Sequence, residues 1–324
     1  GNKQTDTGAD QALPDTVAGY TGNVPENDHR NIHNVGALYD PSTDKIYGRK
    51  CQCMSREEFE ALSEKKTESP YRYMERDMDF FQVRGDYRYL YVLASDPGML
   101  QDRELWLSMG ADGIRGNEFS VTGVKFTGWG KTAVRGGSHI RGTGCIFDII
   151  GGSTHEYEPY WIRFGNGVEF WADQSVDVEV RDSRFSRVFD TATTIQGPMS
   201  RDKDSHCSDI HIHHNVIECC RQDFEVWVRS GEGLMPERCS FTHNIGRDCG
   251  NNGFDTCEYN NTHLLHYILS PYRVEDIAVK DNEFYGGMGL YYANSAMDNM
   301  AIGCNIYHCA QGAPVIRGLY GNLE

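Results

Sequence analysis

The chain has 324 residues, with 35 Gly, 10 Pro and 31 Lys and Arg against 47 Asp and Glu, a net charge of −16. Abundant glycine with so little proline excludes a collagen-like or Pro-rich disordered chain. The acidic balance argues against a nucleic-acid partner, which calls for a basic face. No apolar run approaches the roughly 18 residues of a membrane helix, so we expect no membrane-spanning segment.

The first part of the chain shows little periodicity. Residues 1–30 are polar and are interpreted as a tail or linker. Residues 31–118 are expected to form an irregular α+β region that packs on the rest of the protein. Within it, Ser55-Arg-Glu-Glu58 is a capping box that predicts a short helix. Further on, Met78–Val83 and Tyr87–Leu93 flank a Gly-containing turn and predict a hairpin.

From residue 119 the sequence becomes a series of short alternating strands separated by Gly, Asn and Asp. The recurring unit is a strand, a residue that is mostly small or polar, and then a bulky residue. The middle position falls at Val124, Cys145, Ser183, Asn215, Asn244, Asn282 and Asn305, with spacings of 21, 38, 32, 29, 38 and 23. We expect Asn here to adopt left-handed backbone geometry at a bend and to hydrogen-bond to the Asn of the next coil.

This pattern resembles the right-handed parallel β-helix of the pectate-lyase-like superfamily, in particular its poorly characterised bacterial carbohydrate-active branch. The resemblance covers residues 119–318 and implies an all-β solenoid over residues 119–324, with three short strands per coil. An irregular β-sandwich with Gly-rich turns is the alternative architecture. In the β-helix family one side of the solenoid usually forms a glycan groove, so the resemblance implies a glycan substrate.

Strand alternation indicates where catalytic carboxylates lie. In Phe224-Glu-Val-Trp-Val228 the residues Phe224, Val226 and Val228 are expected to point inward, which leaves Asp223, Glu225 and Trp227 outward. Counted from the repeat Asn of its coil, Glu225 is at offset 10 and Asp255 at offset 11, which predicts adjacent carboxylates at the separation of a retaining glycosidase pair. Asp190, in the preceding loop, could pair with Glu225 at a larger separation. Repulsion would raise the pKa of one acid and keep it protonated, although such acids could also be merely solvated or bind Ca²⁺.

The predicted substrate contacts combine flat aromatic faces with polar and cationic groups. They are Trp227, Trp171, Gln196, Arg229, Arg163, His263 and His266. In Ile210-His-Ile-His213, Ile210 and Ile212 are expected to point inward, so His211 and His213 share an outward face. No third ligand stands out beside them, and no metal site is predicted. The 11 cysteines lack zinc-type pairing and are expected to be small core residues, with one or two disulfides left open.

These features predict a glycoside hydrolase that cleaves a polysaccharide or oligosaccharide in a groove on the side of the solenoid. No cofactor is expected, with Ca²⁺ left open. A polysaccharide lyase is the first alternative, although the basic pair and acidic calcium motif of lyases are missing. A non-catalytic glycan-binding or surface-adhesion solenoid is the second. Because polymeric glycans are met outside the cytoplasm, we expect a secreted, periplasmic or cell-surface protein whose export signal has been removed from this chain.

Overall fold

The computed structural model describes residues 17–21, 33–48, 74, 76–83, 86–101, 103–157, 160–171, 174–198, 207–229, 236–254, 262–268, 276–287, 289–293, 300–308 and 316–318. Across these ranges the regular elements are strands, apart from one 3-10 turn, η2 (Pro97–Leu100). The all-β prediction is confirmed, while the short helix predicted from Ser55 falls outside the described residues. Within those same ranges, no helix has the length and apolarity that a membrane crossing requires.

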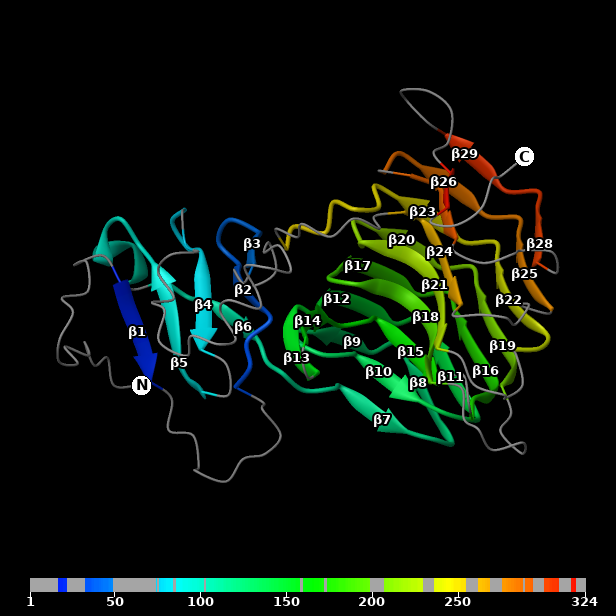
Figure 1. The fold of residues 1–324 in the computed structure, drawn as a ribbon, viewed down its shortest axis with the longest axis horizontal. Helices are drawn as coiled ribbons and strands as arrows, with labels where there is room; N and C mark the ends of the chain where they lie inside the picture. The colour runs from blue at the N-terminus through cyan, green and yellow to red at the C-terminus, as the bar shows by residue number, and fades with distance from the viewer. Residues whose placement is uncertain are drawn as a thin grey trace.

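Three parallel sheets are stacked coil on coil into a body that we call the solenoid (Figure 1). Sheet 1 contains β7 (Ile114–Gly116), β10 (Val134–Gly136), β15 (Val168–Trp171), β18 (Thr191–Pro198), β21 (Gln222–Arg229), β24 (Leu264–Ile268), β27 (Tyr291–Ala293) and β30 (Ile316–Gly318). Sheet 2 contains β8 (Phe119–Thr122), β11 (Ile140–Thr143), β16 (Val176–Arg181), β19 (Ser208–His213), β22 (Cys239–Thr242), β25 (Ile277–Lys280) and β28 (Met300–Gly303). Sheet 3 contains β9 (Lys125–Thr127), β12 (Ile146–Ile150), β17 (Arg184–Val188), β20 (Val216–Glu218), β23 (Ile245–Arg247), β26 (Glu283–Tyr285) and β29 (Ile306–His308). The chain visits sheets 1, 2 and 3 in turn, so each full coil adds one strand to every sheet.

The corner between sheets 2 and 3 is two residues long in all seven described coils that contain it. The second residue of each pair is the repeat position identified from the sequence. The first residue has a positive φ and is, in chain order, Gly123, Gly144, Asp182, His214, His243, Asp281 and Cys304. The expectation that Asn itself adopts the left-handed geometry is therefore wrong, because the residue before it makes the bend.

The Asn side chains form the predicted ladder along the solenoid axis. The amide nitrogen of Asn215 donates to Asn244 Oδ1 at 3.0 Å, and that of Asn244 donates to Asn282 Oδ1 at 3.1 Å. Asn282 continues the ladder to Asn305 Oδ1 at 2.9 Å. Each of these carbonyl oxygens also accepts the backbone N–H of the preceding ladder residue. The ladder thus satisfies buried polar groups while fixing the register of successive coils.

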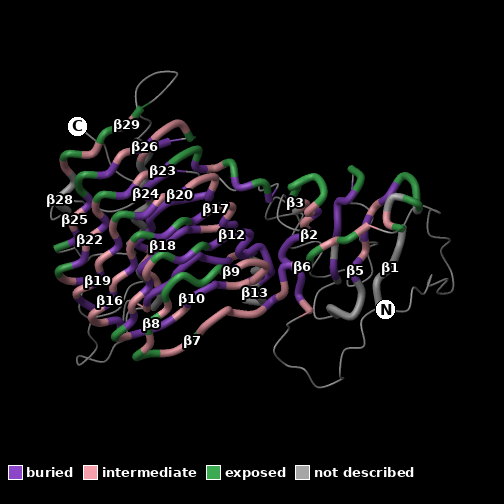
Figure 2. Tube along the Cα trace, turned by 180° about the vertical axis from the view of Figure 1, so that it is seen from behind, coloured by how far each residue is buried: buried purple, intermediate pink, exposed green. Residues whose placement is uncertain are grey.

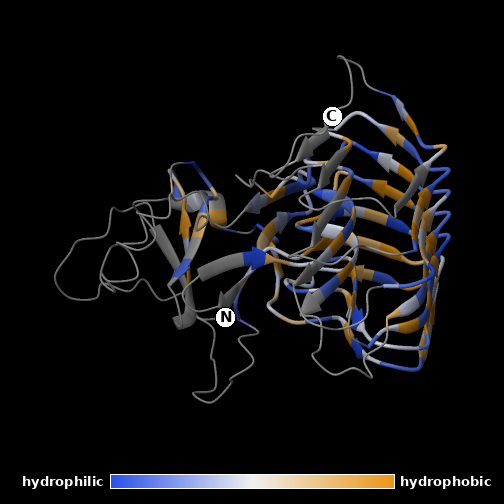
Figure 3. Ribbon diagram, turned by 45° about the vertical axis from the view of Figure 1, so that its right-hand side comes forward, coloured by the Kyte–Doolittle hydropathy of each residue, from blue (hydrophilic) through white to orange (hydrophobic). Residues whose placement is uncertain are grey.

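Stacked apolar side chains fill the solenoid interior, with one interruption. Buried and hydrophobic positions recur along the stacked coils, as the colours of Figures 2 and 3 show. One row of sheet 3 residues in register runs Phe126, Phe147, Phe185, Ile217, Gly246, Phe284 and Tyr307. At Gly246 the row has no side chain, and a Cβ there would overlap Asp223 Oδ2 and lie 3.0 Å from His263 Nδ1. The space is therefore occupied by a polar pair in place of a ring.

Two small antiparallel sheets make up the described N-terminal region, which lies beside the solenoid (Figure 1). One consists of β1 (Val17–Thr21), β5 (Asp86–Leu93) and β4 (Phe80–Val83), and the other of β3 (Lys45–Gly48), β2 (Ala37–Asp40) and β6 (Trp106–Ser108). The predicted hairpin is confirmed as β4 and β5. Strand β1 lies in the segment interpreted as a tail, and it pairs with β5.

Arg163 joins this region to the solenoid. It lies on the antiparallel hairpin β13 (Ser153–Tyr157) and β14 (Tyr160–Phe164), inserted between β12 and β15. The Arg163 side chain is 1% exposed, and its guanidinium donates to the carbonyls of Gly152 at 2.8 Å and Gly36 at 3.1 Å. Nearby, the amide of Asn34 donates to the Thr154 carbonyl at 2.6 Å. Hydrogen bonds from within the solenoid therefore hold the N-terminal backbone.

Candidate functional site

The candidate site lies on the outer face of sheet 1, over β15, β18 and β21. Phe170, Ile195 and Val226 of these strands belong to the core, so the alternate residues belong to the outer face. Two outer rows run across the three strands in register: Glu169, Thr194 and Glu225, and, two residues further on, Trp171, Gln196 and Trp227. The structure thus brings together Glu225, both predicted tryptophans and Gln196.

Glu225 is a buried acid at the centre of this face, with a residue exposure of 7%. Thr194 Oγ1 lies 3.1 Å from one carboxyl oxygen, and Thr191 Oγ1 lies 3.3 Å from the other. Burial, followed by the negative charge of Asp190, raises the pKa of Glu225 to about 8, although Arg221 and the two hydroxyls act in the opposite direction. The carboxyl group is therefore protonated at neutral pH.

The hydrogen bonding of Thr191 agrees with a neutral Glu225. Thr191 Oγ1 lies 2.7 Å from Gln222 Oε1 and 3.3 Å from Glu225 Oε2. A hydroxyl group has one proton to donate and can still accept. When Thr191 gives its proton to the nearer Gln222 oxygen, a protonated Glu225 can donate to Thr191.

Asp190 and Arg221 form an ion pair at the corner that precedes β18 and β21. The distance from Arg221 Nη1 to Asp190 Oδ1 is 2.6 Å, and the two side chains are 9% and 18% exposed. The negative charge of Asp190 acts on Glu225 and raises its pKa. Asp190, predicted as an acidic partner, therefore lies within electrostatic reach of Glu225.

Glu169 is a second acid on this face, and it is 4% exposed. Its Oε2 accepts hydrogen bonds from Arg135 Nη2 at 2.8 Å, Asn166 Nδ2 at 3.0 Å and Thr132 Oγ1 at 3.1 Å. Asn166 in turn accepts the backbone N–H of Thr191 at 3.2 Å. Sequence reasoning did not select Glu169. The sequence does contain a signal for it. Asn166, Thr191 and Gln222 are polar residues that lie three positions before Glu169, Thr194 and Glu225, at matching places on consecutive coils.

The aromatic row offers two flat faces along the solenoid axis. Trp171 and Trp227 are half-buried and flank Gln196. Strands are about 4.8 Å apart, so positions two strands apart are separated by about 9.5 Å. The guanidinium of Arg115 lies 5.2 Å from the Trp171 ring centroid. Such a row suits stacking against the apolar faces of sugar rings in an extended chain.

The predicted pairing of Glu225 with Asp255 falls outside what the structure describes. The residue in register with Glu225 on the next coil is Leu265, and Asp255 itself lies outside the described residues. Offsets counted from the repeat Asn fail here because a long connection, residues 248–263, separates β23 from β24. Arg229 and His266 lie in β21 and β24, in register with Pro198 and Val226; their side chains are outside what the structure describes.

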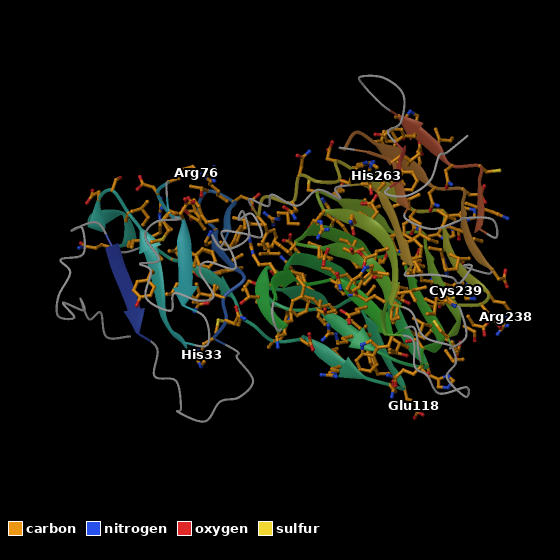
Figure 4. All side chains as sticks on the ribbon, in the orientation of Figure 1. His33, Arg76, Glu118, Arg238, Cys239 and His263 are labelled. Carbon is orange, nitrogen blue, oxygen red and sulfur yellow. The ribbon has the colours of Figure 1, made fainter. Side chains whose placement is uncertain are left out.

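His263 lies in the core, which corrects its predicted contact with a groove (labelled in Figure 4). Its Nδ1 donates to Asp223 Oδ2 at 2.5 Å, and Nε2 donates to the Gly286 carbonyl at 3.1 Å. Burial opposes protonation, but the Asp223 carboxylate outweighs it and holds the pKa of His263 well above 6.5. Asp223 was expected to point outward, yet it fills the space beside Gly246. Arg163 is likewise committed to the junction described above and offers no surface to a substrate.

The described residues contain no cluster of three or more His, Cys, Asp or Glu that could hold a metal ion. His211 and His213 are half-buried on sheet 2, where His211 pairs with Ser240 and His213 with Glu179. Five of the cysteines in the described ranges are buried thiols, in line with the expected core role: Cys145, Cys207, Cys220, Cys239 and Cys249.

Comparison of the chain with protein-family models, curated proteins and solved structures gave no match.

Proposed function

We propose that this protein is a glycoside hydrolase built on a right-handed parallel β-helix of the pectate-lyase-like kind. It cleaves a polysaccharide or oligosaccharide on the outer face of sheet 1. One observation carries the proposal: Glu225 is a carboxyl group whose pKa is raised to about 8. Glycosidases need such an acid, protonated at neutral pH, to donate a proton to the leaving oxygen of the glycosidic bond.

The surroundings of Glu225 support this role. Before reaction, burial and the Asp190 charge keep its proton in place. After proton transfer, the new carboxylate has the hydroxyls of Thr191 and Thr194 within hydrogen-bonding distance. Trp171 and Trp227 provide faces for sugar rings on the same side of the sheet. A polymeric substrate of this type fits a secreted, periplasmic or cell-surface protein.

Glu225→Gln tests the proposal. Wild-type protein is first screened against plant, algal, bacterial and host polysaccharides for release of reducing ends. On a substrate that it cleaves, we expect kcat to fall by roughly 100-fold or more, because Gln keeps the shape of the neutral acid but cannot donate its proton. Glu179→Gln on sheet 2 is the matched control and should retain activity.

Three results would contradict the proposal. Unchanged turnover by Glu225→Gln removes Glu225 as the acid. Products with the ultraviolet absorbance of an unsaturated uronide identify a lyase. Binding of a glycan by wild-type protein without cleavage of any polysaccharide identifies a non-catalytic binding module.

A further inference from the structure

We propose that Glu169 is the second catalytic carboxylate, which activates a water molecule, and that cleavage inverts the configuration of the anomeric carbon. This inference rests on the proposed role of Glu225 as the acid. It departs from the sequence expectation of two acids on adjacent strands, because a threonine occupies the strand between them.

The spacing of the two acids carries the first step. Glu169 is in register with Thr194, and Thr194 is in register with Glu225. The acids are therefore two strands apart, and their backbone positions are separated by about 9.5 Å. Retaining glycosidases hold their carboxyl groups about 5–5.5 Å apart, whereas inverting enzymes need about 6.5–9.5 Å to admit water. The short side chain of Thr194 occupies the interval.

The two acids also differ in their charged neighbours, as an acid–base pair requires. Glu225 lies near the negative charge of Asp190 and carries a proton at neutral pH. Glu169 instead faces a cation, because Arg135 Nη2 contacts its Oε2 at 2.8 Å, with side-chain exposures of only 18% and 5%. Within the described part of the chain, all hydrogen bonds of Glu169 go to Oε2. Its Oε1 accepts none and is not fully enclosed. One oxygen is thus anchored and the other is open to receive a proton.

A hydrogen-bonded connection holds the two acids in a fixed relation. Asn166 donates to Glu169 Oε2 at 3.0 Å and accepts the backbone N–H of Thr191 at 3.2 Å. The hydroxyl of Thr191 then contacts Glu225 Oε2 at 3.3 Å. Asp190 has a different part: paired with Arg221, it supplies the charge that raises the pKa of Glu225.

The reaction balances without a cofactor. Glu225 gives its proton to the glycosidic oxygen as the bond from that oxygen to the anomeric carbon breaks. Glu169 takes a proton from water, whose oxygen forms the new bond to the opposite face of the anomeric carbon. One water molecule is consumed, and proton exchange with solvent restores both acids.

Wild-type protein and two variants test the inference. Proton NMR at the start of cleavage should show the inverted anomer. Glu169→Gln should lower kcat by roughly 100-fold or more with little change in KM. The alkaline limb of the pH profile of kcat/KM, which Glu225 sets, should persist in this variant. Glu169→Asp keeps the charge but withdraws the carboxylate by one methylene, so the same loss of kcat is expected even if the Gln variant does not fold.

The outcomes separate this inference from the proposed function. Retention of configuration, or wild-type kcat in either folded Glu169 variant while Glu225→Gln is inactive, overturns the role of Glu169 and leaves the hydrolase intact. Failure of the wild-type protein to cleave any polysaccharide overturns the proposed function itself.

Discussion

The strand position of Glu225 predicts an exposed side chain, but its environment is buried. Alternation assigns it to the outer face of β21, yet its exposure is only 7%. Two hydroxyl groups of the neighbouring strand β18, those of Thr191 and Thr194, contact the carboxyl oxygens, and the Asp190–Arg221 pair lies close enough to affect Glu225. Polar side chains on the outer face can therefore be excluded from solvent when residues of adjacent coils provide their hydrogen-bond partners.

The stability of the protein should record the raised pKa of Glu225. The unfolded chain releases this proton near pH 4.5, whereas the folded protein holds it to about 8. The resulting stabilisation is fully present below pH 4.5 and is lost as pH rises through about 8, by up to about 1.4 kcal/mol per pH unit. Urea unfolding of wild type and Glu225→Gln at several pH values in this window should show a shallower fall for the variant. Parallel curves would contradict the raised pKa.

Sequence reasoning succeeds at the residue scale where alternation alone decides. It identified Ile210 and Ile212 as inward and Glu225 as the acid of the outer face. It failed for Asp223 and His263, because these two side chains fill a space created by a glycine on a different sheet. No local pattern contains that information.

At the scale of elements, the two residues of the corner between sheets 2 and 3 have different roles. The first residue supplies a positive φ, which Gly, Asp, His and Cys all provide here. The second supplies the side chain that bonds to the next coil. The recurrence of Asn was predictable from the sequence, but its cause was not. Asn is needed for an amide that donates and accepts at once.

Asn244→Ala should destabilise the solenoid more than Asn305→Ala. Asn244 is buried, and its removal leaves both hydrogens that Asn215 directs at it without an acceptor, at an expected cost of about 1–3 kcal/mol. Asn305 ends the described ladder and is half-buried, so water can replace part of what it provides. Urea unfolding of the two variants measures the difference. Equal losses would show that burial does not set the cost.

At the scale of the whole molecule, the repeat predicted the stacked parallel sheets because each coil follows from its own short segment. The attachment of the N-terminal region could not be predicted in this way. Its attachment depends on contacts such as Asn34 with Thr154, 120 residues apart, and on an arginine whose partners are backbone carbonyls. Carbonyl groups carry no sequence signature, which is why Arg163 was assigned to a substrate.

Arg163→Gln should weaken the junction between the N-terminal region and the solenoid. The loss of charge-assisted bonds to the Gly36 and Gly152 carbonyls should cost about 2 kcal/mol or more. Hydrogen exchange should quicken in residues 33–48. The matched control is Arg238→Gln, which removes an exposed ion pair and should change stability little. Unchanged exchange in residues 33–48 would contradict the role of Arg163.

The fixed length of the corner between sheets 2 and 3 has a consequence for how this protein can change. Every described connection there has two residues, whereas the connections on either side of sheet 1 range up to residues 151–167 between β12 and β15, which include the β13–β14 hairpin. Length variation is thus confined to the two borders of the face that carries Glu169 and Glu225. Loops exchanged at these borders would remodel the walls around a bound chain without displacing the coils beneath it. They are the places at which to graft a new specificity.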